Sequence, residues 1–256
     1  MIPKIIHYCW FGHNPKPKLA KKCIKSWKRK CRGYKIIEWN EDNFDLSECP
    51  LYVRQAYEAG KWAFVTDYVR LKVVYDHGGV YLDTDVELIK NIDYLLINHA
   101  YFGFEDGEHI ATGLGFGAER NAQILKELLD DYNGIPFIKA DGAYDTTPCP
   151  KRNTLVFLRH GLIQDNSKQL LDDNILILPN EYLCPISYKT FEKKITSNTV
   201  SIHWFSASWQ TAEQRINHEN KLAQERKDRI IHLPNRIAIS VLGERNYSKL
   251  KRVFKN

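Results

Sequence analysis

Two aspartates one residue apart, Asp83 and Asp85, are the residues of this sequence best suited to holding a divalent cation. They end the segment YLDTD, which follows an apolar run and a pair of glycines. Mg²⁺ and Mn²⁺ take carboxylate oxygens as ligands and keep positions open for phosphate groups. Such a cation stabilises the negative charge that develops on a departing phosphate. So short a motif also arises by chance, and its surroundings must decide its meaning.

The segment before the pair reads as a buried helix that stops at Gly78-Gly79, since glycine accepts the backbone conformation that ends helices. Asp67 and Arg70 stand three residues apart in this helix and therefore on one surface. The fixed guanidinium fork suits the Asp67 carboxylate. A purely structural ion pair is the alternative reading.

A short strand is predicted after the glycines. Side chains alternate between the faces of a strand, so Tyr81, Asp83, Asp85 and Glu87 are predicted to share one face. Tyr81 would then stand beside the two carboxylates and add a phenol to the same ligand site.

The elements that must position these residues begin with a strand–helix–strand pattern over Pro3–Trp10, Lys18–Arg29 and Gly33–Asn40. This order is typical of an α/β fold with a parallel sheet. Further helices are predicted over Ser47–Gly60, Asn121–Tyr132 and Thr154–Leu162 (capped by Asn153), and strands over Ala100–Glu105, Ile110–Gly117, Ile175–Pro179 and Thr199–Trp204. The glycines of IATGLGFG (110–117) indicate either a close approach of backbone to a ligand or a tight bend.

Length and the absence of linkers predict one catalytic domain, residues 1–210, followed by a basic helical extension, residues 211–256. The opening MIPKIIHYCW lacks the pattern of a signal peptide, and no apolar run approaches about 18 residues. The six cysteines form no CxxC pair. A cytoplasmic protein with reduced thiols is therefore expected.

The predicted extension holds 11 Lys or Arg and 5 Asp or Glu residues, so its net charge of +6 equals that of the whole chain. A run of basic residues of this kind is usually just a solvent-exposed face. Apolar residues interleave with the basic ones, which also allows peripheral contact with an anionic membrane at its inner face. A membrane- or nucleic-acid-binding module acting through this tail is the non-enzymatic alternative.

A second enzyme class uses the same letters. YLDTDVE resembles the first motif of haloacid-dehalogenase-type phosphatases, in which Asp83 would be the nucleophile and Asp85 the acid/base. Those proteins usually carry Thr or Ser where this chain has Glu87.

Four segments together resemble a known family: IPKIIHYCWFG, WAFVTDYVRLKVVYDHGGVYLDTDV, ILPNEYLCPI and SIHWFSASW. They are similar to the glycosyltransferases with a DXD sugar-binding motif (family 32), which include capsular polysaccharide and lipopolysaccharide enzymes and α-mannosyltransferases. The glucosylating domain of large clostridial toxins is a more distant likeness. The resemblance covers roughly residues 2–210. It implies a GT-A-type, Rossmann-like fold with a mixed, largely parallel sheet flanked by helices.

The resemblance also implies roles for single residues. Trp10 would pack on the nucleotide base, and Asp67 and Arg70 would contact the donor sugar. Asp83 and Asp85 would hold Mn²⁺ or Mg²⁺ on the diphosphate, with Asp85 the direct ligand. The remaining matched residues would close over the diphosphate, namely His203, Ser208 and Trp209, with His203 a further metal ligand.

Each of these residues has an ordinary structural alternative. Trp10 would serve equally as a core aromatic, His203 as a satisfied, partly buried histidine, and Trp209 as the start of a helix. The segment TTPCP (146–150) departs from the Thr-Gly-Pro that relatives often carry, so the role of this loop stays open.

The activity implied is retaining transfer of a hexose from a UDP- or GDP-linked sugar, with Mn²⁺ or Mg²⁺, to a saccharide or lipid-linked glycan acceptor. The expected setting is bacterial surface polysaccharide synthesis, and no nucleic-acid partner is expected. Trp10 stacking suits uracil and guanine alike, so the base stays open.

Overall fold

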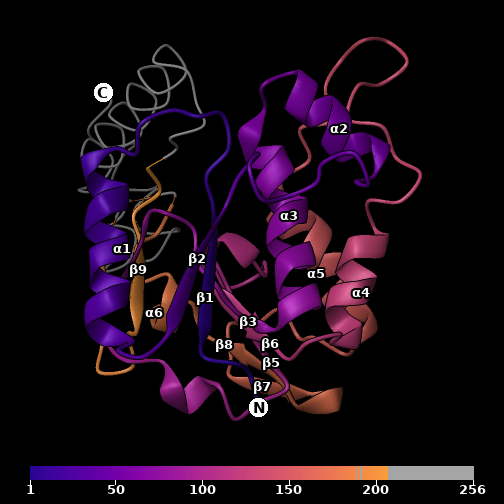
Figure 1. The fold of residues 1–256 in the computed structure, drawn as a ribbon. Helices are drawn as coiled ribbons and strands as arrows, with labels where there is room; N and C mark the ends of the chain where they lie inside the picture. The colour runs from indigo at the N-terminus through magenta and orange to yellow at the C-terminus, as the bar shows by residue number, and fades with distance from the viewer. Residues whose placement is uncertain (189, 191, 207–256) are drawn as a thin grey trace, which may run out of the picture. The chain divides into compact units, whose positions relative to one another are not determined.

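The computed structural model describes residues 1–188, 190 and 192–206 (Figure 1). The predicted extension, residues 211–256, and its boundary after residue 210 lie outside the described residues. None of the helices in the described part of the chain has the length and apolar character needed to cross a membrane.

Within the described residues, a seven-stranded sheet has the order β2-β1-β3-β6-β5-β8-β7. Its strands are β1 (Ile5–Cys9), β2 (Lys35–Trp39), β3 (Gly79–Tyr81), β5 (Ala100–Gly103), β6 (Phe116–Ala118), β7 (Gln169–Leu171) and β8 (Ile175–Leu178). Strands β1, β2, β3, β5 and β8 run in one direction, and β6 and β7 run against them. A separate pair joins β4 (Val86–Leu88) to β9 (Ser201–His203) in antiparallel fashion.

Helices cover both faces of the large sheet (Figure 1). The helical segments are α1 (Lys18–Lys30), α2 (Leu51–Glu58), α3 (Trp62–His77), α4 (Gln123–Asp130), α5 (Cys149–Arg159), α6 (Asn180–Leu183) and the 3-10 turns η1 (Asp93–Leu95), η2 (Thr112–Leu114) and η3 (Asp172–Asn174). The predicted α/β class, a mixed sheet flanked by helices, is confirmed.

Alternation along the strands divides the core in two. In β8, Ile175 and Ile177 pack with α2–α5, whereas Leu176 and Leu178 pack on the other face with residues of α1 and β4. Because successive side chains of a strand point to opposite faces, a strand buried on both faces reads as the continuous apolar run ILIL.

Helix α3 lies against the sheet and is buried along most of its length, including Val69, Arg70 and Val74. It ends at Gly78, whose φ of 64° favours glycine. A Cβ on Gly79 would come within 2.9 Å of His7 Nε2. His7 fills this turn by donating from Nε2 to Gly78 O (2.9 Å) and accepting from Trp39 Nε1 at Nδ1 (3.0 Å).

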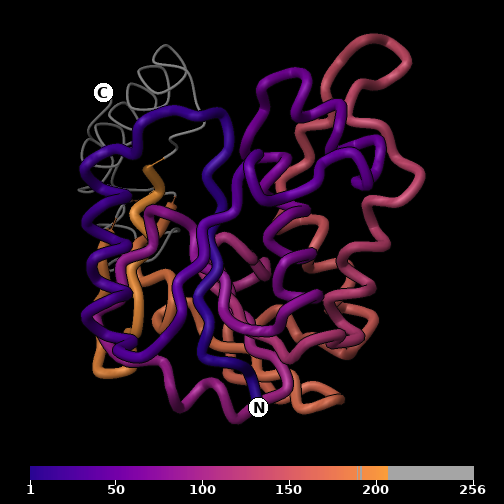
Figure 2. Tube along the Cα trace, viewed as in Figure 1, coloured from indigo at the N-terminus to yellow at the C-terminus, as the bar shows by residue number. Residues whose placement is uncertain are grey.

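Helix α1 packs on the small sheet. Trp27 Nε1 donates to Val86 O (2.7 Å), and Leu88 N donates to Ser26 Oγ (2.9 Å). Figure 2 shows the orange segment of β9 beside the violet segment of β4, although the two are far apart in the sequence. The small sheet is therefore anchored to the first helix of the chain.

Three local predictions were wrong. The strand predicted to carry both aspartates ends at Tyr81, and the chain then turns into the second sheet. Asn153 is no cap but a buried residue inside α5, which begins at Cys149 after Pro148. In the segment 110–117, a 3-10 turn at Thr112–Leu114 replaces the middle of the predicted strand.

Candidate metal centre

The two aspartates lie in the turn between β3 and β4, where the chain leaves the large sheet. Val86 N donates to Asp83 O (2.9 Å) and closes the turn. Alternation along a strand predicted that the two carboxylates share one face. That prediction is wrong, because neither aspartate lies in a strand. A tight turn nevertheless keeps the two close together at the carboxyl edge of β3.

Strand β9 brings His203 to this turn. In the β4–β9 pair, His203 stands opposite Val86, and Trp204 N donates to Asp85 O (3.1 Å). His203 Nε2 lies 3.2 Å from Asp85 Oδ1. Ligand atoms of Asp83, Asp85 and His203 all fall within 4.8 Å of one another, close enough to hold one metal ion.

Asp85 is held as an anion. Ser206 donates to Asp85 Oδ2 from both its backbone N (2.8 Å) and its Oγ (2.9 Å). Burial favours the protonated acid, but His203 and these Ser206 bonds hold the pKa of Asp85 well below its ordinary value. Sequence reasoning missed Ser206, because it singled out the nearby Ser208.

His203 carries the complementary charge. Burial would lower its pKa, but Asp85 and Cys184 raise that pKa well above the ordinary value. A metal ion takes neutral imidazole, so cation and proton compete for Nε2. His203 Nδ1 is buried and has no hydrogen-bond partner among the described residues.

Arg70 joins the helix to the metal turn. Its Nη2 lies 2.9 Å from Asp67 Oδ1 and 3.6 Å from Asp83 Oδ1, and its Nε donates to Thr66 O (3.0 Å). Burial raises the pKa values of Asp67 and Asp83, while Arg70 opposes the rise at both. The predicted pairing of Asp67 with Arg70 is thus part of a three-residue network.

Tyr81 contacts two residues of this network, Asp83 and Arg70. Its hydroxyl donates to Asp83 Oδ1 (2.9 Å), and its ring lies 5.3 Å from the Arg70 guanidinium. The side chain is 1 % exposed. Tyr81 therefore contacts Asp83 and Arg70 and orients both.

Gly113, in η2, leaves the space that Asp83 and Arg70 occupy. A Cβ at this position would meet Asp83 Oδ2 at 2.7 Å and Arg70 Nη1 at 3.0 Å. The glycine-rich segment 110–117 thus provides both a bend and a close approach to the acidic cluster.

Trp10 follows β1 at the same edge of the sheet as the aspartates. Its Nε1 donates to Asn14 O (2.6 Å), and Lys16 Nζ lies 5.7 Å from its ring. The ring is partly buried against the core shared with α1. Ser208 and Trp209, also predicted here, lie outside the described residues.

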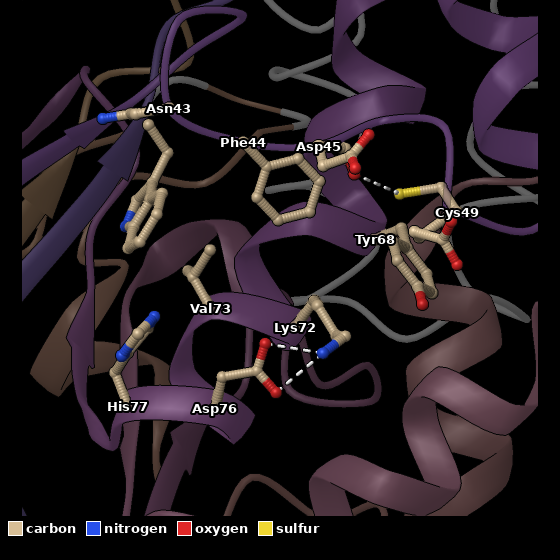
Figure 3. Close-up of a pocket in the computed structure, with 11 residues that line it drawn as sticks. Asn43, Phe44, Asp45, Cys49, Tyr68, Lys72, Val73, Asp76 and His77 are labelled. Carbon is tan, nitrogen blue, oxygen red and sulfur yellow. Dashed lines mark hydrogen bonds and ion pairs between the residues drawn. The ribbon is translucent and has the colours of Figure 1, made fainter.

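A hollow of about 260 Å³ lies on a different part of α3 (Figure 3). Figure 3 shows Lys72 paired with Asp76 on the helix, with Nζ–carboxylate distances of 2.5 and 2.7 Å. Trp39 stacks on His77 at 5.3 Å. None of the residues predicted for the site lines this hollow, so it is distinct from the acidic cluster.

Comparison with known sequences finds a family match that includes the turn with Asp83 and Asp85. Residues 17–102 match the family described as "Glycosyltransferase sugar-binding region containing DXD motif". This region includes Asp67, Arg70, Asp83 and Asp85. The match therefore contains the second of the four motifs, which carries the aspartate pair and the helix before it.

Three individual proteins are similar over longer stretches. An uncharacterized glycosyltransferase, L373, of Acanthamoeba polyphaga mimivirus is 31 % identical over a 145-residue alignment, which covers 53 % of this chain and 49 % of the relative. The match thus spans about half the length of that relative. Among solved structures, the PaToxG glycosyltransferase (17 % identity, TM-score 0.46) aligns over 62 % of this chain and 69 % of its own. A glycosyltransferase involved in glycosylation of the major capsid of PBCV-1 (17 %, 0.46) aligns over 85 % and 99 %.

Proposed function

We propose that this protein is a glycosyltransferase that moves a hexose from a UDP- or GDP-linked sugar to a saccharide or lipid-linked glycan acceptor, with retention of anomeric configuration. The observation that carries the proposal is the convergence of Asp83, Asp85 and His203 within 4.8 Å, beside the Arg70–Asp67 pair. The matched sugar-binding region supports the same activity. Retention and the hexose rest on the family resemblance.

The three converging side chains fit a divalent cation. Two carboxylates and one imidazole form an open set, because these three ligands leave further coordination positions for phosphate oxygens. The imidazole favours Mn²⁺ over Mg²⁺, which prefers oxygen ligands. Bound there, the cation would neutralise charge on the leaving diphosphate.

The protein's own residues divide the remaining work. Arg70 keeps a full positive charge between Asp67 and Asp83, close to the place where negative charge develops. The half-buried carboxylate of Asp67 accepts hydrogen bonds from sugar hydroxyls. Tyr81 and Gly113 fix Asp83 in position. The acceptor hydroxyl can lose its proton to an oxygen of the leaving phosphate, so this scheme needs no protein base.

The test is a screen of UDP- and GDP-hexoses against the full chain, with Mn²⁺ or with EDTA. We expect at least one donor to bind more tightly and to be hydrolysed faster with Mn²⁺. A complete lack of metal-dependent binding or hydrolysis across the screen would falsify the proposal.

The phosphatase alternative is less well supported. In that reaction Asp83 must attack phosphorus with a free carboxylate oxygen. Here Asp83 Oδ1 accepts the Tyr81 hydroxyl and lies 3.6 Å from Arg70 Nη2, which leaves Oδ2 for attack. The stronger objection is Glu87, which stands where those phosphatases usually carry Thr or Ser. Turnover of a generic phosphate ester through a covalent aspartyl-phosphate would favour the phosphatase instead.

Capsular polysaccharide or lipopolysaccharide synthesis in a bacterial cytoplasm remains the proposed setting, and it rests on the resemblance alone. Peripheral contact of residues 211–256 with an anionic membrane belongs to the same proposal. Each basic residue at such a surface contributes about 1 kcal/mol. Replacing Lys249, Lys251, Arg252 and Lys255 by Gln in the full chain should weaken binding to phosphatidylserine vesicles and leave donor hydrolysis intact. Unchanged vesicle binding would refute the contact.

A further inference from the structure

Glu105 lies two residues beyond the end of β5, at the edge of the sheet that also carries the metal turn. Strand β5 runs in the same direction as β3, because each is antiparallel to β6. The carboxyl ends of β3 and β5 therefore lie at one edge, and in open α/β sheets this edge binds ligands. No motif in the sequence had singled out Glu105.

The loop that bears Glu105 is firmly held. Glu105 N donates to His109 O (2.8 Å), and Asp106 Oδ1 accepts the backbone N–H groups of Glu108 (3.1 Å) and His109 (2.9 Å). Gln164 Nε2 donates to Glu108 O (2.8 Å). A position fixed in this way suits a residue that must meet a ligand in one geometry.

The surroundings of Glu105 link it to both halves of the acidic site. Burial raises its pKa, and nearby His203 opposes the rise. Burial likewise raises the pKa of the Cys149 thiol well above its usual value, and Asp67 and Glu105 raise it further. Cys149 begins α5 and lies 3.9 Å from Thr112 Oγ1, on the turn that holds Gly113. His203 and the Cys149 thiol, which itself neighbours Asp67, are thus both near enough to Glu105 for its charge to act on them.

Glu105 differs from the other carboxylates of the site in what its oxygens already bind. Asp67 pairs with Arg70, Asp83 accepts Tyr81, and Asp85 accepts Ser206. The Glu105 carboxylate has no hydrogen bond or ion pair within the described part of the chain, although the residue is half-buried. Buried carboxylates are normally paired, so a half-buried and unpaired one at a ligand-binding edge is available to a hydrogen-bond donor of the ligand.

We propose that the Glu105 carboxylate accepts a hydrogen bond from a hydroxyl of the transferred sugar, and so helps to select the sugar part of the donor. This inference rests on the proposed glycosyltransferase function. A charged acceptor on a sugar hydroxyl makes a strong hydrogen bond, and its loss leaves the hydroxyl unpaired in the site. Glu105 acts on the sugar, whereas the metal centre acts on the diphosphate.

The test compares the affinity for nucleotide-hexoses with the affinity for the free nucleoside diphosphates UDP and GDP, both with Mn²⁺. Glu105→Ala should weaken binding of the nucleotide-hexose by about tenfold or more and change binding of the diphosphate less than about twofold. Glu105→Gln keeps the shape of the side chain and should show the same selective loss, to a smaller extent. Glu108→Gln, an exposed residue of the same loop, is the matched control and should change neither affinity.

The outcomes are separable. Equal loss for sugar nucleotide and diphosphate, or no loss for either, would overturn the role of Glu105 and leave the glycosyltransferase proposal standing. If wild-type protein binds neither ligand with Mn²⁺, the proposed function itself fails. Should Glu105→Ala fold poorly, the Glu105→Gln affinity ratio decides the matter.

Discussion

His203 Nε2 lies 3.2 Å from Asp85 Oδ1, and the antiparallel pairing of β4 with β9 fixes that distance. The two residues neutralise each other when no cation is bound, and in the proposed metal centre both would be ligands of one cation. The contact therefore joins the structural and the proposed catalytic roles of the small sheet.

Changing Asp85 to Asn should lower Mn²⁺ affinity at least about tenfold, since even residues that only support metal ligands cost about that much. The amide keeps the shape of the side chain but lacks the charge that attracts a cation. Metal titration followed by electron paramagnetic resonance measures the effect. Exposed Asp172→Asn is the control and should bind metal as the wild type does. Retained affinity in Asp85→Asn would move the metal elsewhere.

Changing Gly113 to Ala should displace Asp83, because the new Cβ would lie 2.7 Å from its Oδ2. We expect weaker Mn²⁺ and donor binding with only a modest loss of thermal stability. Gly142→Ala is the control, and it should change thermal stability but not metal affinity. Its φ of 80° strains an alanine, at a cost of about 1 kcal/mol, but no atom lies within 4 Å of the added Cβ. It should lower the melting temperature and leave metal affinity unchanged.

Changing Arg70 to Met should destabilise the fold by about 3–5 kcal/mol, since it leaves buried carboxylates without their cation. Adding Asp67→Asn should restore part of this loss, because the second change removes one of those carboxylates. Urea unfolding of the wild type, both single variants and the double variant measures the coupling. Simple additivity would show that the 2.9 Å contact contributes nothing.

Acid should weaken the fold through His7. Burial lowers the pKa of His7 to about 4 in the folded state, against 6.5 as the ordinary value. Between those values the unfolded chain binds a proton that the folded protein excludes, so stability falls as pH drops from 6.5 towards 4. The loss should reach about 2 kcal/mol by pH 5.

His7→Gln isolates this effect, because glutamine does not titrate. The variant should be less stable than wild type at pH 7, since one amide replaces both ring contacts to Gly78 and Trp39. The difference between the two proteins should shrink as the pH falls to 5. A difference that stays constant with pH would rule out His7 as the titrating group.

The sequence predicted the parts of the site that lie close together along the chain. Asp67 and Arg70 are one helical turn apart, and helical spacing alone places them in contact. The apolar runs likewise located most strands, because a strand buried on both faces has few other readings. The α/β class followed from the strand–helix–strand opening.

The parts that failed depend on distant partners. Alternation assumed that one strand continues past Tyr81, but β4 leaves the large sheet to pair with β9. Nothing local to Asp83 or Asp85 shows this. Glu105 was overlooked for the same reason, although its place at the end of a predicted strand was a usable signal. The start of α5 at Cys149 could have been predicted from Pro150, since proline is common in the first turn of a helix.

The pairing of β4 with β9 also governs when the protein acquires its site. Synthesis proceeds from the N-terminus, so the matched region, residues 17–102, leaves the ribosome long before His203 and Ser206 exist. Until they arrive, Asp85 has neither its imidazole nor its serine donors. A nascent chain with the whole matched region therefore lacks a complete set of the proposed metal ligands, and metal capture would report that β9 has paired with β4.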